Sequence, residues 1–275
     1  MSLTSPQDTC VPTRQPTLFV PHGGGPCFFM EGADIWDTMA AYLRGIAATL
    51  PQRPTAILVV SGHWETTVPT VTSGLAPPLI YDYRGFPEHT YHLRYPAPGS
   101  PHLAARVRAL LGAAGIESAE DPTRGFDHGV FIPFMLAFEH ADIPVVELSL
   151  RHDMDAAAEW ATGAALAPLR DENVLIVATG MTFHNLRDFV GRNPATDALS
   201  RDFDAWLAQA VGSAPEVRKD ALLHWENAPG ARTCHPREEH LLPLMIAAGA
   251  AQGDPGQHSY ADTVMGKALS GFRFG

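Results

Sequence analysis

Apolar residues along the chain form two kinds of pattern that alternate. Short runs rich in Val, Ile and Leu are typical of strands buried on both faces, and they occupy residues 17–21, 56–60, 143–150 and 174–179. Segments with apolar residues every three or four positions are typical of amphipathic helices, and they occupy residues 37–50, 101–111, 153–169, 196–211 and 238–251. The alternation predicts an α/β fold: a single domain with a mostly parallel central sheet covered by helices on both faces.

Turn and cap residues add detail to this outline. Ser100 and Pro101 suit the N-cap and first turn of one predicted helix, and Gly112 and Gly115 suit its end. Residues 73–100 form a long segment rich in Pro, Gly and Tyr, and loops of that length in compact domains are usually functional. We expect residues 1–15 to be a loose N-terminal leader and residues 16–275 to form the domain.

Composition and charge exclude several classes of protein. Hydrophobic residues make up 45% and charged residues 18% of the 275 residues, as in globular proteins. The net charge is −11 without a basic run, so we expect no nucleic-acid partner. Three cysteines without a CxxC pair argue against a disulfide framework or a zinc–thiolate site and favour a cytoplasmic location. We expect no signal peptide and no membrane span, because no apolar stretch approaches ~20 residues.

Three of the 13 histidines follow predicted buried strands: His22, His63 and His184. The carboxyl ends of parallel strands form the edge at which open α/β sheets bind ligands. A single histidine there is more often a hydrogen-bonded structural residue, but three at one edge predict a metal or catalytic site. Imidazole is the commonest metal-binding side chain and suits Zn, Fe, Cu and Ni.

The segment HPREEH supplies further candidates. His235 and His240 flank Glu238 and Glu239 where the last helix is expected to begin. Acidic residues favour the first turn of a helix because of its dipole, and that role alone explains Glu238. It does not explain His240, which is therefore a fourth candidate ligand.

Two other segments contain residues that could bind a ligand or take part in catalysis. Gly23 to Gly25 follow His22 and would let the backbone approach a ligand closely, but the Lys and Ser/Thr of a phosphate-binding loop are missing. In the segment FDHG, Asp127 is a candidate cap of another helix, and His128 then faces solvent unless it points into the site. We expect the remaining histidines to be surface or packing residues: His89, His92, His102, His140, His152, His224 and His258.

The motifs in combination resemble the class III extradiol ring-cleaving dioxygenases, in particular the DOPA 4,5-dioxygenase type. The segments that carry the resemblance are PTLFVPHGGGP, SGHW, GFPEHTYHLRYPAPGSP, GFDHG, TFHNL and HPREEH, and it extends from about residue 17 to residue 275. It implies that residues 16–275 are one extradiol dioxygenase catalytic domain. The glycine run after His22 and the TGMTFHNL segment depart from the usual family pattern, and both bear on the substrate.

Carried over residue by residue, the resemblance implies Fe(II) held by His22, His63 and His240, with zinc able to occupy the site in purified protein. His184 and His128 match catalytic histidines, and His184 is also a possible further metal ligand. Better-known class III enzymes use two histidines and a glutamate, so Glu239 competes with His240 for the third position. We prefer His240 as the ligand and place Glu239 behind it, as an orienting residue.

The resemblance also implies a reaction, in which a small aromatic diol of the catechol type and O₂ give a ring-opened product. Histidine suits the proton transfers near neutral pH, so His128 and His184 are the expected acid and base. Tyr83, Phe86 and Tyr95, with Tyr91, come from the long loop and are candidates to contact the aromatic ring, although simple loop packing explains each of them equally well. We expect a monomer or small homo-oligomer.

Two other functions are compatible with the same residues. A zinc-dependent hydrolase would use the histidines and Glu239 to activate water. A scaffold without activity is also conceivable, because relatives with this fold can lose their ligands. The filled ligand positions argue against the scaffold.

Overall fold

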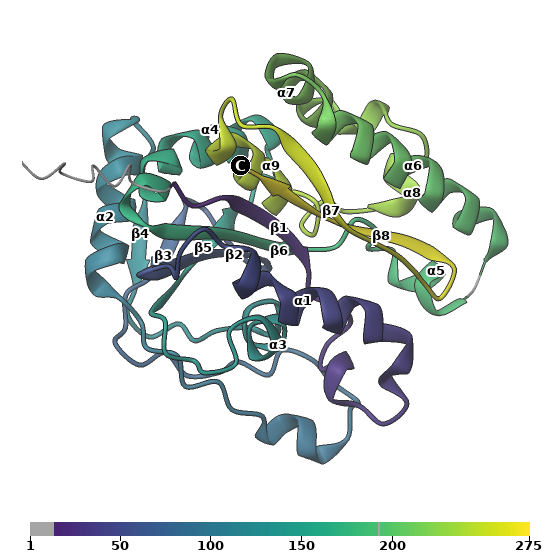
Figure 1. Cartoon of the computed structure of the whole chain (residues 1–275), viewed down its shortest axis with the longest axis horizontal. Helices are drawn as coiled ribbons and strands as arrows, with labels where there is room; N and C mark the ends of the chain where they lie inside the picture. The colour runs from purple at the N-terminus through teal and green to yellow at the C-terminus, as the bar shows by residue number, and fades with distance from the viewer. Residues whose placement is uncertain (1–13, 192) are drawn as a thin grey trace, which may run out of the picture.

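One eight-stranded sheet forms the centre of the part of the chain that the computed structural model describes, residues 14–191 and 193–275. Its strand order is β4-β3-β5-β2-β6-β1-β8-β7 (Figure 1). The strands are β1 (Thr17–Pro21), β2 (Ala56–Thr66), β3 (Thr70–Thr72), β4 (Ala119–Asp121), β5 (Val145–Arg151), β6 (Val174–Gly180), β7 (Gly256–Val264) and β8 (Lys267–Phe274).

The four predicted strands are neighbours in the middle of this sheet. β5, β2, β6 and β1 run parallel to one another, while β3 pairs antiparallel with β5 and the β7–β8 hairpin pairs antiparallel with β1. The predicted α/β fold with a mostly parallel sheet is therefore confirmed. The pairing of β2 with β5 is regular only as far as Val60 and shifts before Glu65, so His63 lies in an irregular part of β2 rather than just past its end.

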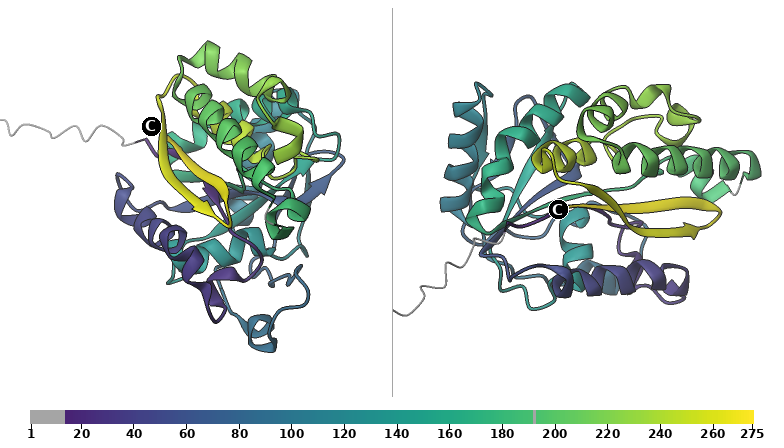
Figure 2. Two further views of the ribbon diagram at one scale, coloured as in Figure 1. Left: turned by 90° about the vertical axis from the view of Figure 1, so that its right-hand side faces the viewer. Right: turned by 45° about the horizontal axis from the view of Figure 1, so that its top comes forward.

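Helices cover both faces of the sheet, as predicted (Figures 1 and 2). α1 and α3 pack together on one face, and α4 and α9 pack together on the other, with α2 beside α4 and α6 against β8. The helices are α1 (Asp37–Thr49), α2 (Pro101–Ala113), α3 (His128–Ala137), α4 (Ala156–Leu166), α5 (Leu186–Gly191), α6 (Pro194–Gly212), α7 (Pro215–Leu223), α8 (Ala231–Cys234) and α9 (Pro243–Ala251). None of the helices in the described ranges is long and apolar enough to span a membrane.

Helix caps confirm one prediction and correct two. The Ser100 hydroxyl accepts a hydrogen bond from the Leu103 amide at the start of α2, as expected. Asp127 occupies the N-cap position of α3 but makes no cap hydrogen bond with its side chain. The last predicted helix begins at Pro243 rather than at residue 238, because proline, which lacks an N–H, fits the first turn, and residues 239–242 form turns instead.

Of the predicted N-terminal leader, residues 1–15, the structure describes only the last two residues. Residues 1–13 lie outside the described residues. Gln15, expected at the end of the leader, is buried, and its side-chain amide donates hydrogen bonds to the Gln52 carbonyl oxygen (2.9 Å) and to Asn173 (2.6 Å). The ordered domain therefore includes Gln15.

Candidate metal and substrate site

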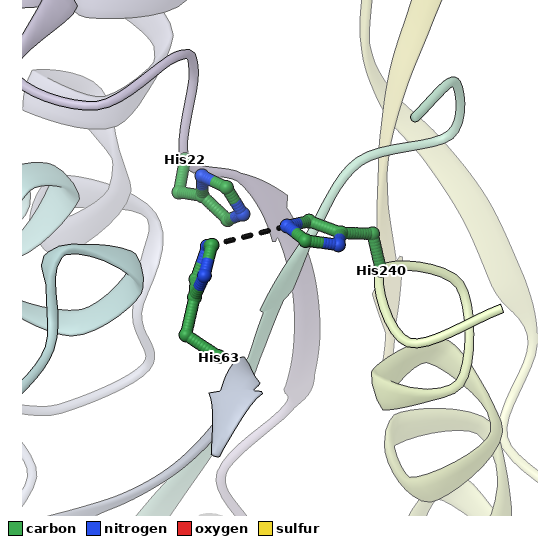
Figure 3. Close-up of side chains that lie close together, drawn as sticks. All are labelled: His22, His63 and His240. Carbon is green, nitrogen blue, oxygen red and sulfur yellow. Dashed lines mark hydrogen bonds between the residues drawn. The ribbon is translucent and has the colours of Figure 1, made fainter. Parts of the chain in front are cut away.

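Three histidines from distant parts of the sequence converge at the carboxyl edge of the central strands (Figure 3). His22 directly follows β1, His63 lies in β2, and His240 lies in the turn before α9. A ligand atom of each lies within 4.8 Å of the others. The Nε2 atoms of His63 and His240 are 3.2 Å apart. We call this group the histidine triad.

Two glycines allow the third histidine to reach the strand ends. A Cβ atom on Gly180 of β6 would lie 2.1 Å from the carbonyl oxygen of His240, and one on Gly62 of β2 would lie 2.8 Å from that of Glu239. Both distances are shorter than real contacts, so the turn carrying these residues packs directly on the strand backbone only because no side chain intervenes. Hydrogen bonds from the His22 amide to the Gly180 carbonyl (3.2 Å) and from the Met181 amide to the His240 carbonyl (3.0 Å) fix the junction.

Gly180→Ala should therefore displace His240 and weaken metal binding by at least about tenfold, with a loss of about 1–3 kcal/mol of folding stability from overpacking. Gly45→Ala in α1 is the matched control, because a Cβ there has no neighbour within 4 Å. Metal titration and thermal unfolding of both variants provide the measurement. Unchanged metal affinity in Gly180→Ala would show that the close approach does not position His240.

The triad has the properties of an unprotonated metal-binding site. Burial lowers the pKa of His22 and of His240 well below the usual value and that of His63 to about 4, with the neighbouring histidines adding to the effect. Neutral imidazoles offer the lone pairs that a metal ion requires. Both ring nitrogens of His22 are buried and lack a hydrogen-bond partner. A buried polar atom of this kind is costly unless something satisfies it, and a metal ion between the three rings would satisfy one of the two nitrogens.

A second pair lies beside the triad. Asp82 Oδ1 accepts hydrogen bonds from the backbone amide (3.0 Å) and from Nδ1 (2.8 Å) of His128. Its other oxygen is 3.6 Å from Nδ1 of His63. Burial opposes ionisation of Asp82, but the hydrogen bonds and charges of the histidines outweigh it and lower the pKa of Asp82 to about 2. The carboxylate thus fixes the His128 ring, whose centroid lies 4.0 Å from that of His63.

A third group joins His184 to His240 through Glu239. The Nδ1 atoms of both histidines donate to the same oxygen, Oε1 of Glu239, at 2.9 Å each. The two rings are stacked with their centroids 3.3 Å apart. Burial raises the pKa of Glu239, but the hydrogen bond and charge of His184 outweigh this and leave it lowered. Glu239 therefore holds Nδ1 of His240, which leaves Nε2 of that ring for the centre of the triad.

All of these groups line one cavity of about 750 Å³. Tyr83 and Phe86 of the long loop line it, and their rings are 5.5 Å apart. Tyr95 is not among its lining residues: its ring packs against Phe134, and its hydroxyl donates to the Phe138 carbonyl at 3.2 Å. Tyr91 does not line it either. The placement of Tyr95 argues against the predicted substrate contact, because its aromatic surface is used within the core.

The cavity contains further residues that sequence reasoning did not single out. Asp82, Arg84, Glu65 and Arg237 supply its additional charged groups, and its remaining apolar walls come from Trp36, Met181, Phe183, Leu186, Phe189 and Met265. In the sequence, only the position of Asp82 and Arg84 in the long loop indicated that they could belong to the site. Nothing in the sequence pattern pointed to the apolar walls.

The other two candidates lie outside the site. His235 is fully buried, its Nε2 hydrogen-bonds the Thr182 carbonyl (3.0 Å), and burial lowers its pKa to about 3. The Asp127 carboxylate accepts from the Ser61 hydroxyl (2.7 Å) and from Arg124 (2.9 Å) behind the cavity wall. Both residues stabilise the elements that carry the site.

Comparisons with known proteins agree with this geometry. Residues 21–272 match the family described as the catalytic LigB subunit of aromatic ring-opening dioxygenase. The chain is 42% identical to the 4,5-DOPA dioxygenase extradiol of Beta vulgaris over 78% of each chain. It is 36% identical to dioxygenase tasH of Hapsidospora irregularis, covering 94% of this chain and 85% of that protein. A crystal structure of an uncharacterized Escherichia coli K12 protein superposes with a TM-score of 0.77 at 30% identity, covering 95% of this chain and 100% of the other.

The family match extends over nearly the whole chain and includes every histidine of the triad. The relatives are well above 30% identical over most of their own length. The chain therefore belongs to the LigB family of aromatic ring-opening dioxygenases and is a class III extradiol dioxygenase.

Proposed function

We propose that this dioxygenase depends on Fe(II) held by His22, His63 and His240, and that it opens the ring of a catechol-type substrate. The observation that carries the proposal is the convergence of three imidazoles, two buried and one half-buried, in which neither nitrogen of His22 has a hydrogen-bond partner. Three protein ligands leave coordination positions open. Fe(II) bound there would supply positions for the catechol oxygens and O₂ and would couple the two reactants electronically.

His128 is the proposed base for the catechol hydroxyl. Because Asp82 accepts from Nδ1, the neutral His128 ring carries its proton there and keeps a lone pair on Nε2. The ring lies in the cavity, with its centroid 5.4 Å from that of His22 and 4.0 Å from that of His63. A base at this position would take a proton from a hydroxyl that approaches the triad.

His184 is the proposed acid for the later cleavage step. Glu239 accepts from its Nδ1 and so fixes the tautomer and the ring orientation. The ring also lines the cavity and stacks on His240. It could instead act as an additional metal ligand, as the sequence suggested, since it forms a possible ligand group with Glu239 and His240.

His128→Ala should reduce kcat by about 10²–10⁴-fold, the usual contribution of general acid–base catalysis, while Fe(II) affinity stays within a few-fold of wild type. His184→Ala should lose a similar factor, with some metal affinity lost as well if the ring is a ligand. His92→Ala is the control, because His92 belongs to the same loop region as Asp82 but is exposed and pairs with Glu88. Wild-type turnover in His128→Ala would exclude this histidine as acid or base.

The substrates that fit this proposal are an aromatic diol and O₂. The relatives from Beta vulgaris, Portulaca grandiflora and Escherichia coli are named for DOPA, a catechol. Trp36 and Phe189, which stack with their centroids 6.3 Å apart, and Phe86 provide aromatic walls that suit such a ring. A cytoplasmic location and a monomeric or small oligomeric state remain predictions from the sequence.

The proposal is tested by loading the protein anaerobically with Fe(II), adding a catechol and then O₂. Consumption of O₂ with appearance of a yellow ring-opened product would support it. Activity with zinc alone, or hydrolysis of an ester or amide without O₂ uptake, would instead favour the hydrolase.

A further inference from the structure

The two arginines that line the cavity differ in how their charge is balanced. Arg237 binds both oxygens of Glu65, at 2.5 and 2.6 Å, and lies 3.7 Å from Glu239. Arg84 is exposed at the cavity and, among the described residues, no hydrogen bond or ion pair is found for it. A cation at the cavity that has no ion-pair partner among the described residues is available to a ligand.

Each carboxylate that lines the cavity, in contrast to Arg84, already has a partner. Asp82 accepts twice from His128, and Glu65 is bound by Arg237 and lies 3.3 Å from His152. Glu239 accepts from His184 and His240, and its other oxygen is buried and lies 3.7 Å from Arg237. An ammonium group on a substrate would have to share a carboxylate that a histidine or an arginine already engages, whereas a carboxylate would give Arg84 a partner.

The neighbours of Arg84 in the loop place it beside the expected position of the aromatic ring. Tyr83 and Phe86 both line the cavity, and the Phe86 ring lies against Gly25, where an added Cβ would be 3.0 Å from it. Gly85, between Arg84 and Phe86, has a φ of 80°, a left-handed turn that glycine adopts without strain. The loop thus presents an aromatic wall and a guanidinium group in consecutive positions.

We propose that Arg84 binds a carboxylate on the side chain of the substrate, so that the enzyme prefers catechols with an anionic chain and no ammonium group. This rests on the proposed function, since the ring diol would occupy the triad. A guanidinium binds a carboxylate through two parallel N–H donors, which adds orientation as well as affinity. The expected order of substrates is hydrocaffeate, then DOPA, which has the same carboxylate plus an ammonium group, then dopamine, which has the ammonium group alone.

Arg84→Gln provides the test, with kcat/KM measured on the Fe(II)-loaded full chain for hydrocaffeate, DOPA, dopamine and uncharged methylcatechol. The ratio of hydrocaffeate to methylcatechol should fall about tenfold, mainly through KM, as expected for a charge-assisted hydrogen bond that is partly exposed to water. Arg84→Glu should reverse the order of hydrocaffeate and dopamine. Arg94→Gln is the matched control: it makes the same charge change in the same loop at an exposed residue that does not line the cavity, and its ratio should not change.

Two results would overturn the proposal: an unchanged ratio in Arg84→Gln, or equal use of dopamine and hydrocaffeate by the wild type. If no catechol is turned over, the proposed function fails instead. Anaerobic binding of the same four compounds, followed by the fluorescence of the protein, which includes Trp36 in the cavity, then still decides the role of Arg84. Equal affinities of wild type and Arg84→Gln for hydrocaffeate would reject it.

Discussion

His22→Ala should abolish Fe(II) binding and ring-opening activity together. His22 is 1% exposed and, with both ring nitrogens unpaired, makes no side-chain hydrogen bond that the substitution would break. Loss of a residue that only orients a ligand lowers metal affinity roughly 10–100-fold. Loss of one of the three ligands themselves should lower it further. Anaerobic metal titration followed by elemental analysis of the desalted protein gives the measurement.

Thermal unfolding separates loss of a ligand from loss of the fold. A metal that binds only the folded state raises the melting temperature, so Fe(II) should stabilise the wild type and leave His22→Ala unchanged. His224→Ala is the control, because the side chain of that exposed histidine has hydrogen-bond and ion-pair contacts only with Asp220 among the described residues, and the variant should behave as the wild type does. Full metal occupancy in His22→Ala would remove this residue from the proposed ligand set.

The second large effect concerns the neighbouring residues Glu239 and His240. His240→Ala should lose the metal, because its Nε2 lies 3.2 Å from Nε2 of His63 at the centre of the triad. Glu239→Ala should keep the metal with an affinity about 10–100-fold lower, because Glu239 orients the His184 and His240 rings. Glu239→Gln, which keeps an acceptor of the same size, should lie between Glu239→Ala and the wild type.

The result also bears on the charge of the centre. Three neutral histidines leave the full charge of Fe(II), one unit more than an arrangement with a glutamate ligand. A more positive centre should bind a catecholate more tightly and lower the pKa of its hydroxyls further. Metal lost in Glu239→Ala and retained in His240→Ala would show that the chain uses the carboxylate arrangement.

The sequence predicted the core of the fold because the parallel strands are nearly pure apolar runs. It did not predict the β7–β8 hairpin, where β7 exposes polar residues such as Gln257 and His258 and has no apolar run. It placed the start of the last helix too early, because Glu238 and Glu239 resemble a first turn when Pro243 is ignored. The first error arises where strand pairing outweighs the local pattern, and the second arises from a local signal, the proline at the helix start, that was not weighed.

The candidate site was predictable to a similar extent. His22 and His63 follow apolar runs in recognisable motifs, so their convergence could be inferred from strand ends alone. Asp82 could not be found this way, because its partner His128 is 46 residues away. The sequence pattern does not indicate which way an aromatic side chain in a loop points. It therefore could not predict that Tyr83 lines the cavity while Tyr95 packs in the core.

We propose that the protein, with Fe(II) held by the histidine triad, inserts both atoms of O₂ into a catechol. The most direct measurement is a single-turnover reaction of the Fe(II)-loaded protein with hydrocaffeate and isotopically labelled O₂, analysed by mass spectrometry. We expect one O₂ to be consumed per ring opened, both labelled atoms to appear in a ring-opened semialdehyde, and His22→Ala to form no such product. Oxidation of the catechol to a quinone without incorporation of label, or equal product formation by His22→Ala, would contradict it.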